Sequence, residues 1–218
     1  MTTDRENLTA LGQRAKKQLR ARLGATRRAL PASAVAARSA RIVAALERLA
    51  PLATARAVAS FWPMEASAEV DLRPLDRLLE ARGVARYFPF MDPKGEGFST
   101  GFRRVTSADE LEERGRKFRE PPRSAPVAAR GDIDVVLVPA LGVTPDGHRL
   151  GYGAGFYDAT LPDVAPPALT IVVAFTFQLL GELFIEDHDI ACDLVVTDGE
   201  MFDPRGVLAP IRSPERGI

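Results

Sequence analysis

Three glycines at alternate positions, Gly151, Gly153 and Gly155, lie in the segment from Arg149 to Asp158. Because glycine has no β-carbon, successive backbone N–H groups in such a loop can turn inward onto an anion. Arg149 adds a planar guanidinium whose donors match phosphate oxygens. The segment therefore suits a phosphate group, although glycines at this spacing are equally typical of a plain tight turn.

Asp158 follows the last glycine by three residues, so its carboxylate could help to hold Mg²⁺ beside nucleotide phosphates. A helix beginning at Gly155 and running to Leu161 would add its unpaired amide groups to the phosphate site. The glycine spacing is neither the dinucleotide G-x-G-x-x-G nor a P-loop ending in Gly-Lys-Ser/Thr. A dinucleotide-dependent dehydrogenase and an ordinary P-loop ATPase are therefore disfavoured.

Two helices are predicted before the first strand. Apolar residues at helical spacing indicate one helix over about residues 7–23, on which Lys16 and Arg20 share a face. A second helix is predicted after Pro31 and ends near Pro51. The apolar positions that define the two helices are, in order, Leu8, Leu11, Ala15, Leu19, Leu23, Val35, Ile42, Val43, Leu46 and Leu49.

Short apolar runs then alternate with helical patterns. A helix over residues 72–82 with Asp71 as its cap, a short helix after Ser107 and another over residues 178–183 are predicted. Residues 119–131, with three prolines, are expected to form an exposed connection. Strands are predicted at residues 55–61, 84–90, 98–105 (as short pieces), 133–141, 168–175 and 193–198.

This alternation predicts an α/β fold with a largely parallel central sheet flanked by helices. The arrangement is Rossmann-like but has no dinucleotide fingerprint. The 218-residue length favours a single domain over residues 1–198, followed by an irregular tail over residues 199–218.

Composition narrows the class of protein. Hydrophobic residues make up 46% and charged residues 27% of the chain, which is typical of a folded globular protein. Residues 1–50 carry eleven Lys or Arg and three acids, which suits an anionic ligand or a solvated helix face. Nucleic acid is disfavoured because no aromatic residues are interleaved for base stacking.

The single cysteine, Cys192, cannot form an internal disulfide, so a reducing compartment and a cytoplasmic location are expected. Neither a signal peptide nor a stretch of membrane-spanning length is recognised. A monomer is assumed.

The segment DVVLVPALGVTPDGHRLGYGAGFYDATL, residues 134–161, resembles the signature of the 5-formyltetrahydrofolate cyclo-ligase (methenyltetrahydrofolate synthetase) family. Further similar segments follow the family's order, so the resemblance spans roughly residues 16–197. They are Lys16–Arg20, Glu69–Asp71, Glu120–Pro121 and His188–Asp189. Ala154, Phe156 and Thr144 depart from the pattern, and the connection between Met64 and Glu69 is longer than usual.

The resemblance implies that ATP activates the formyl oxygen of 5-formyltetrahydrofolate, giving 5,10-methenyltetrahydrofolate, ADP and phosphate. Arg149 and Tyr157 are implied as catalytic residues, and Asp158 and Asp189 as Mg²⁺ ligands. The implied ATP-binding residues are Lys16, Lys17, Gln18, Leu19, Arg20, Arg149, Leu150, Gly151, Tyr152, Gly153, Ala154, Gly155, Phe156 and Tyr157. The implied folate-binding residues are Trp62, Glu69, Tyr152, Gly153, Ala154, Gly155 and Phe156.

Glu69 could accept hydrogen bonds from the N–H edge of a reduced pterin, and Trp62 could pack against its ring. An exposed glutamate and a core tryptophan are the plain alternatives. Charge alone recommends Lys17, Arg22, Arg27 and Arg28, so their side chains are expected to be solvated. His148 and His188 are assigned no catalytic role.

Two other functions stay open. One is an ATP-dependent enzyme of the same family with another substrate, because the loop constrains ATP better than Glu69 and Trp62 constrain the acceptor. The other is a non-catalytic nucleotide- or folate-binding protein.

Overall fold

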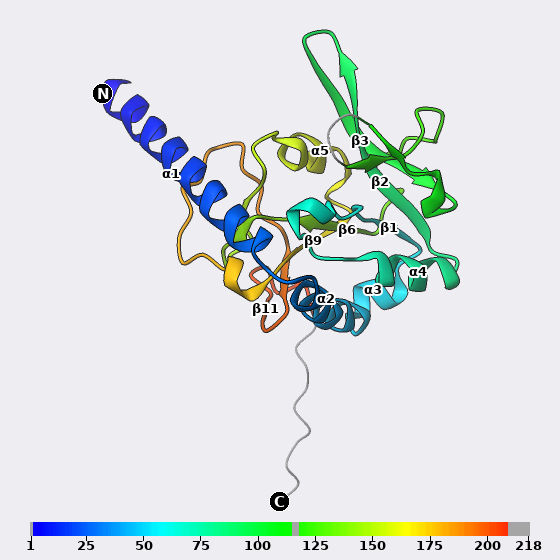
Figure 1. Ribbon diagram of the computed structural model, residues 1–218. Helices are drawn as coiled ribbons and strands as arrows, with labels where there is room; N and C mark the ends of the chain where they lie inside the picture. Colours follow the sequence, from blue (N-terminus) through cyan, green and yellow to red (C-terminus); the bar gives the residue numbers. More distant parts are fainter. Residues whose placement is uncertain (1, 115–117, 209–218) are drawn as a thin grey trace, which may run out of the picture.

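The computed structural model describes residues 2–114 and 118–208. Its centre is a seven-stranded sheet with the order β11-β10-β9-β6-β1-β2-β3 (Figure 1). The five inner strands are parallel to their neighbours, and β3 and β11 run antiparallel at the two edges. The strands are β1 (Ala57–Ala59), β2 (Ala85–Lys94), β3 (Gly97–Val105), β6 (Val135–Pro139), β9 (Leu169–Ala174), β10 (Leu194–Thr197) and β11 (Met201–Phe202). The predicted largely parallel α/β fold is confirmed.

Helices cover both faces of the sheet (Figure 1). On one face, α2 (Ala32–Glu47), α3 (Ala50–Thr54) and α4 (Arg73–Ala81) pack around a core that includes the fully buried Ile42 and Leu46. On the other face, α5 (Phe156–Val164) packs against a second apolar cluster through Leu161 and Val164. Both faces are therefore buried, which explains why the inner strands read as continuous apolar runs rather than alternating ones.

Helix α1 (Thr2–Arg28) is longer than predicted, and its first half extends away from the sheet (Figure 1). Leu8 and Leu11, which the periodicity placed on a buried stripe, are each 60% exposed, whereas Leu23 near the other end is buried. Only the second half of the apolar stripe is packed. That half approaches the 3-10 helix η1 (Glu65–Ser67) and the short strand β7 (Gly142–Val143), which pairs with β8 (Arg149–Leu150).

Several predicted elements differ from the structure. Pro51 lies in the first turn of α3 instead of ending a helix, because a proline at that position loses no helical hydrogen bond. The helix predicted over residues 178–183 is not formed. A 3-10 helix, η3 (Thr176–Gln178), precedes this segment and ends at Gln178. Gln178 is fully buried, and its amide donates to the carbonyl oxygens of Ala140 and Leu141, so it bridges to the chain after β6.

Further differences lie in the connections. Residues 98–105 belong to one long strand, β3, which forms a hairpin with β2. The expected exposed connection contains β5 (Arg119–Glu120), which pairs with β4 (Glu112–Glu113). Glu120 is 3% exposed, and its buried carboxylate accepts the N–H of Met91. The predicted irregular tail contributes β11; residues 209–218 lie outside the described residues.

One predicted helix start is shifted and one is confirmed. Leu72, and not the predicted Asp71, is the cap residue of α4; Asp71 lies one residue earlier and accepts the backbone N–H of Arg73 at 3.0 Å. The 3-10 helix η2 (Ala108–Glu110) follows Ser107, whose side chain caps it. Within the described residues, no single helix has the length and apolar character needed to cross a membrane, and only α1 from Asn7 taken together with α2, bent by 105°, passes such a test.

The strand order reverses at β1. From β1 the chain passes to β2 on one side, and it later enters β6 on the other side. In open parallel sheets, ligands bind outside the carboxyl ends of the strands at such a reversal. The ends of β1 and β6 are therefore the place to look for a site.

Candidate functional site

A cavity of about 730 Å³ opens at the reversal point. Phe61 and Trp62, which follow β1, and Pro139, the last residue of β6, line it. Further lining comes from α1, the glycine loop (residues 149–158), residues near 186–189, the turn that contains Glu69, strand β2 and residues 118–119. Segments far apart in the sequence thus meet at one cavity, whose volume suits small-molecule ligands.

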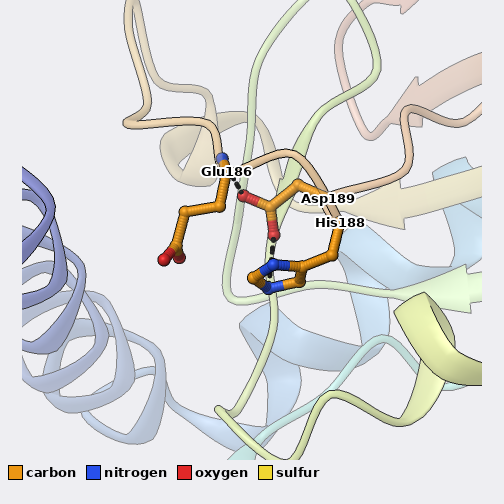
Figure 2. Close-up of side chains that lie close together, drawn as sticks. All are labelled: Glu186, His188 and Asp189. Carbon is orange, nitrogen blue, oxygen red and sulfur yellow. Dashed lines mark hydrogen bonds and ion pairs between the residues drawn. The ribbon is translucent and has the colours of Figure 1, made fainter. Parts of the chain in front are cut away.

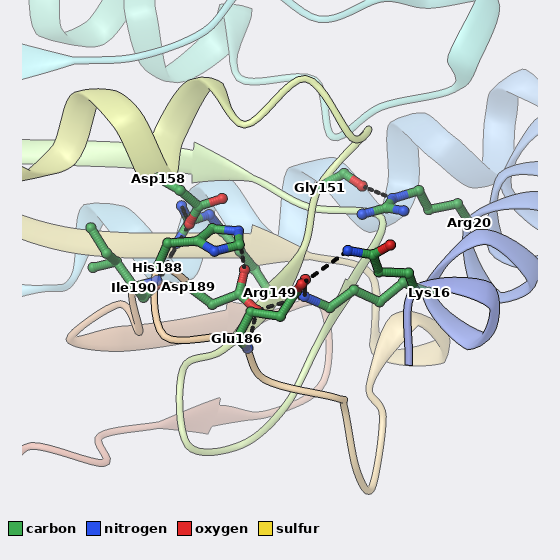
Figure 3. A network of polar contacts seen from close by, with 10 residues as sticks. Lys16, Arg20, Arg149, Gly151, Asp158, Glu186, His188, Asp189 and Ile190 are labelled. Carbon is green, nitrogen blue, oxygen red and sulfur yellow. Dashed lines mark hydrogen bonds and ion pairs between the residues drawn. The ribbon is translucent and has the colours of Figure 1, made fainter. Parts of the chain in front are cut away.

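The glycine loop leads from β8 into α5. Gly153 and Gly155 have φ values of +96° and +67°, which only glycine adopts without strain. Gly155 precedes the first residue of α5, so the predicted helix start is confirmed. Arg20 of α1 donates from Nε to the carbonyl oxygen of Gly151 at 2.9 Å, which ties the loop to α1 (Figure 3).

Lys16 is 5% exposed and lies between two carboxylates (Figure 3). Its Nζ donates to Asp189 Oδ2 at 2.6 Å and to Glu186 Oε2 at 2.9 Å. Burial opposes protonation of Lys16, but the two carboxylates outweigh it and raise the pKa of its ammonium group above the ordinary value. Lys16, Glu186 and Asp189 form the Lys16 cluster, which joins α1 to the segment before β10.

The guanidinium of Arg149 is held by hydrogen bonds to two neighbouring residues. Its Nη2 donates to Asp158 Oδ1 at 2.7 Å, and its Nη1 donates to the carbonyl oxygen of Ile190 (Figure 3). The guanidinium lies 5.8 Å from the ring centre of Tyr157. Burial raises the pKa of the Tyr157 phenol well above its ordinary value, so this group stays protonated. Arg149 is thus a buried, fixed positive charge beside the loop.

Glu69 is 4% exposed, which excludes the plain reading of a solvated glutamate. Its Oε2 accepts the N–H of Met64 at 2.7 Å, and its Oε1 accepts the hydroxyl of Tyr152. Arg27 donates to the same hydroxyl and is 2% exposed. The expectation that Arg27 is solvated is wrong, because helix α1 directs it into the protein beside Glu69.

Trp62 lies where either predicted role is possible. Its ring packs against Phe88 at a centroid distance of 6.5 Å, and it also lines the cavity. The guanidinium groups of Arg73 and Arg119 each lie 5.9 Å from the ring centre. A half-buried indole is therefore available as an aromatic wall.

Glu186, His188 and Asp189 present ligand atoms that all lie within 4.8 Å of one another (Figure 2). Asp189 was predicted as a metal ligand, and Glu186 was missed. Asp158, the other predicted ligand, does not belong to this group among the described residues; its carboxylate accepts from Arg149 and, at 3.3 Å, from the N–H of Ile190.

Most of the predicted site residues line the one cavity. Within the described chain, Gln18 and Leu19 of the predicted ATP segment do not line it, because they lie on other faces of α1. Gln13 was missed, although it precedes Lys16 by about one helical turn and the periodicity could have indicated it. The predicted residues that do line the cavity are Lys16, Lys17, Arg20, Trp62, Glu69, Arg149, Leu150, Gly151, Tyr152, Gly153, Ala154, Gly155, Phe156, Tyr157, Asp158 and Asp189.

Known proteins with similar sequences are cyclo-ligases. A 5-formyltetrahydrofolate cyclo-ligase of Mycolicibacterium smegmatis is 45% identical over 93 residues, which is 42% of this chain and 45% of that protein. The chain thus matches less than half of the length of that relative. The Escherichia coli 5-formyltetrahydrofolate cyclo-ligase is 30% identical over 158 residues, covering 70% of this chain and 84% of the relative.

Solved structures agree. The 5,10-methenyltetrahydrofolate synthetase of Aquifex aeolicus superposes with a TM-score of 0.75 at 26% identity, covering 93% of this chain and 99% of that one. The synthetase of Mycoplasma pneumoniae, at 20% identity, shares the fold with a TM-score of 0.65 over 84% of this chain and 98% of its own. The model of the 5-formyltetrahydrofolate cyclo-ligase family matches residues 12–198. On these grounds, the chain is a member of the 5-formyltetrahydrofolate cyclo-ligase family of enzymes.

Proposed function

We propose that this chain catalyses the ATP-dependent cyclisation of 5-formyltetrahydrofolate to 5,10-methenyltetrahydrofolate, releasing ADP and phosphate. One observation carries the proposal. A single cavity is lined by the cationic side chains of α1 and the glycine loop, and also by the buried Glu69 carboxylate and the Trp62 indole. The first group suits the phosphates of ATP, and the second suits a flat ring that carries N–H donors.

The chemistry explains why both ligands must share one cavity. The formyl carbon is a poor electrophile, and its oxygen is a poor leaving group. Transfer of the γ-phosphoryl group from ATP to that oxygen solves both problems. N10 then attacks the formyl carbon, the C–O bond breaks, phosphate leaves with the oxygen and N10 loses its proton. The protein must position two ligands and neutralise phosphate charge.

At the ATP end, the proposed donors are the N–H groups of the glycine loop together with Lys16, Arg20 and Arg149. Arg149 is pre-oriented by Asp158, so its charge is fixed before ATP binds. Lys16 lies on α1 with Nζ held by two carboxylates. It would exchange one of these for a phosphate oxygen when the nucleotide binds. Tyr157, protonated and beside Arg149, is the proposed hydroxyl donor to the transferring group.

At the folate end, Glu69 would accept hydrogen bonds from the pterin, and Trp62 would pack against a ring of the folate. Tyr152 complements them. Its hydroxyl is bound by Glu69 and Arg27 while the residue is 43% exposed, so the face of its ring is available to a ligand. The loop residues Gly153 to Phe156 complete this wall.

Mg²⁺ is part of the proposal, and the donor atoms fit it. Carboxylate oxygens of Asp189 and Glu186 lie close together, and oxygen ligands are those that Mg²⁺ prefers. The contacts of Asp158 to Arg149 and Ile190 use Oδ1, so Oδ2 is the oxygen that could turn to the ion. Bound there with nucleotide phosphates, Mg²⁺ would neutralise phosphate charge.

The proposal takes a monomer as the active unit. The proposal includes a cytoplasmic location, which agrees with the free, buried Cys192.

Incubating the purified protein with 5-formyltetrahydrofolate, ATP and Mg²⁺, and following the absorbance of the methenyl product, tests the proposal. Turnover should require both ATP and folate. Folate binding without turnover would favour a non-catalytic binding protein. ATP binding without folate binding would favour a family member with a different substrate.

A further inference from the structure

The connection between β1 and α4 contains a turn that brings Glu69 to the cavity. The 3-10 helix η1 is followed by its cap residue Ala68, which has a φ of +49°. This is the left-handed region, which a residue other than glycine adopts only where surrounding contacts hold it. Ala68 separates Ser67 from Glu69, so whatever holds Ser67 also sets the direction in which Glu69 points.

Arg27 of α1 supplies that contact. Its Nε donates to the carbonyl oxygen of Ser67 at 2.6 Å, and its Nη1 donates to the carbonyl oxygen of Ala140 at 3.4 Å. Its Nη2 donates to the hydroxyl of Tyr152 and lies 4.0 Å from Glu69 Oε1. One buried guanidinium thus joins α1, the turn before Glu69, the chain after β6 and the glycine loop.

Arg27 is also the cation beside the Glu69 carboxylate. The groups that face this carboxylate are Arg27 from α1, the Tyr152 hydroxyl from the glycine loop, the N–H of Met64 from its own turn and Tyr157 from α5. Burial raises the pKa of Glu69, whereas the Met64 N–H, the Tyr152 hydroxyl and the charge of Arg27 oppose that rise.

We infer that Arg27 is a positioning residue for the folate end of the cavity: it holds the turn before Glu69 so that the carboxylate is aimed at the pterin, and it fixes the Tyr152 ring beside it. Arg27 is not among the residues that line the cavity, so it acts through Glu69 and Tyr152. The inference rests on the proposed function, because it takes the ligand of Glu69 to be a reduced folate. It assigns Arg27 no part in binding ATP.

The test compares Arg27→Gln, Arg27→Lys and Tyr152→Phe with the wild type, and Arg22→Gln serves as a matched control. Arg22 is an exposed arginine of the same helix, and its side chain lies outside the cavity lining. The dissociation constant for 5-formyltetrahydrofolate is measured from the fluorescence of Trp62, the only tryptophan. Calorimetry gives the dissociation constant for ATP, and circular dichroism verifies folding.

For Arg27→Gln, the folate dissociation constant should rise about tenfold or more, while that for ATP stays within about twofold of wild type. Because the charge of Arg27 opposes the rise in the pKa of Glu69, loss of the cation should also move the acid limb of folate binding to higher pH. Arg27→Lys should keep the wild-type acid limb but bind folate more weakly, because a lysine cannot reach three acceptors in a plane. Tyr152→Phe should weaken folate binding alone, and Arg22→Gln should match wild type.

The inference is overturned if Arg27→Gln binds folate as tightly as wild type with the same acid limb, or if it loses folate and ATP affinity by equal factors. Should Arg27→Gln not fold, Arg27→Lys and Tyr152→Phe decide the matter, and wild-type folate affinity in both would overturn it. A wild-type protein that binds no 5-formyltetrahydrofolate refutes the proposed function and this inference together. Wild-type binding with unchanged variants refutes this inference alone.

Discussion

Arg149 Nη2 lies 2.7 Å from Asp158 Oδ1, and this ion pair joins the first and last residues of the glycine loop. The Arg149 side chain is 3% exposed and that of Asp158 is 25% exposed. The sequence assigned these residues to different ligands, a phosphate and a metal ion. Their contact means that a change at Asp158 acts on Arg149 as well, so the two roles must be separated by measurement.

Replacing Asp158 with Asn should lower turnover about a hundredfold and destabilise the fold by about 3 kcal/mol, because Arg149 would keep a buried charge without its partner. Turnover should be measured across a Mg²⁺ titration. If Asp158 only orients Arg149, the Mg²⁺ concentration for half-maximal rate stays as in wild type. If Asp158 also binds the ion, that concentration rises.

The matched control is Asp163→Asn, because Asp163 is an exposed acid further along α5. It should leave turnover, the Mg²⁺ requirement and stability at wild-type values. Wild-type turnover in Asp158→Asn would contradict the role given to the ion pair.

Replacing Lys16 with Gln should raise the KM for ATP about tenfold, which corresponds to about 1.4 kcal/mol, and leave the KM for folate nearly unchanged. The reason is that Lys16 would lose its charge at the nucleotide end while Glu69 and Trp62 stay in place. Steady-state kinetics with each substrate varied in turn measure both constants. Arg14→Gln, a change at an exposed arginine of the same helix, is the control. Equal rises in both KM values would contradict a specific role at ATP.

The sequence predicted the strands well because parallel strands buried on both faces leave continuous apolar runs, as in residues 133–141 and 168–175. It could not predict which buried polar residues meet. Arg27 and Arg22 look alike in sequence, and only the path of α1 past Ser67 and Tyr152 separates them. Tertiary contacts of this kind also replaced the expected helix at residues 178–183, since the Gln178 amide bonds to distant carbonyl groups.

Replacing Gly147 with Ala should destabilise the protein by about 3 kcal/mol or more, a fall in Tm of about 6 °C or more. Gly147 has a φ of +92°, and a β-carbon there would lie 2.2 Å from the carbonyl oxygen of Cys192. The contrast is Gly151→Ala, where a β-carbon meets nothing within 4 Å. Gly151→Ala should therefore keep the wild-type Tm but impair ATP binding, since Gly151 lines the cavity. Thermal unfolding and calorimetry separate the two effects, and a wild-type Tm for Gly147→Ala would contradict the argument.

The Lys16 cluster should make stability depend on pH in a definite direction. The hydrogen bond from Lys16 lowers the pKa of Glu186, and the pKa of Asp189 is lowered as well because Lys16 and the N–H of Glu186 outweigh its burial. A carboxylate with a lowered pKa stabilises the fold above its ordinary pKa, and this contribution is lost as the pH falls through the lowered value. The raised pKa of Lys16 adds stability that is lost only at strongly alkaline pH.

The difference in Tm between wild type and Lys16→Gln should therefore have its largest value near neutral pH and should shrink below about pH 4. Thermal unfolding of both proteins at several pH values measures it, with Arg14→Gln expected to follow wild type throughout. A difference that stays constant down to about pH 2 would mean that the ion pairs of Lys16 do not hold α1 to residues 186–189.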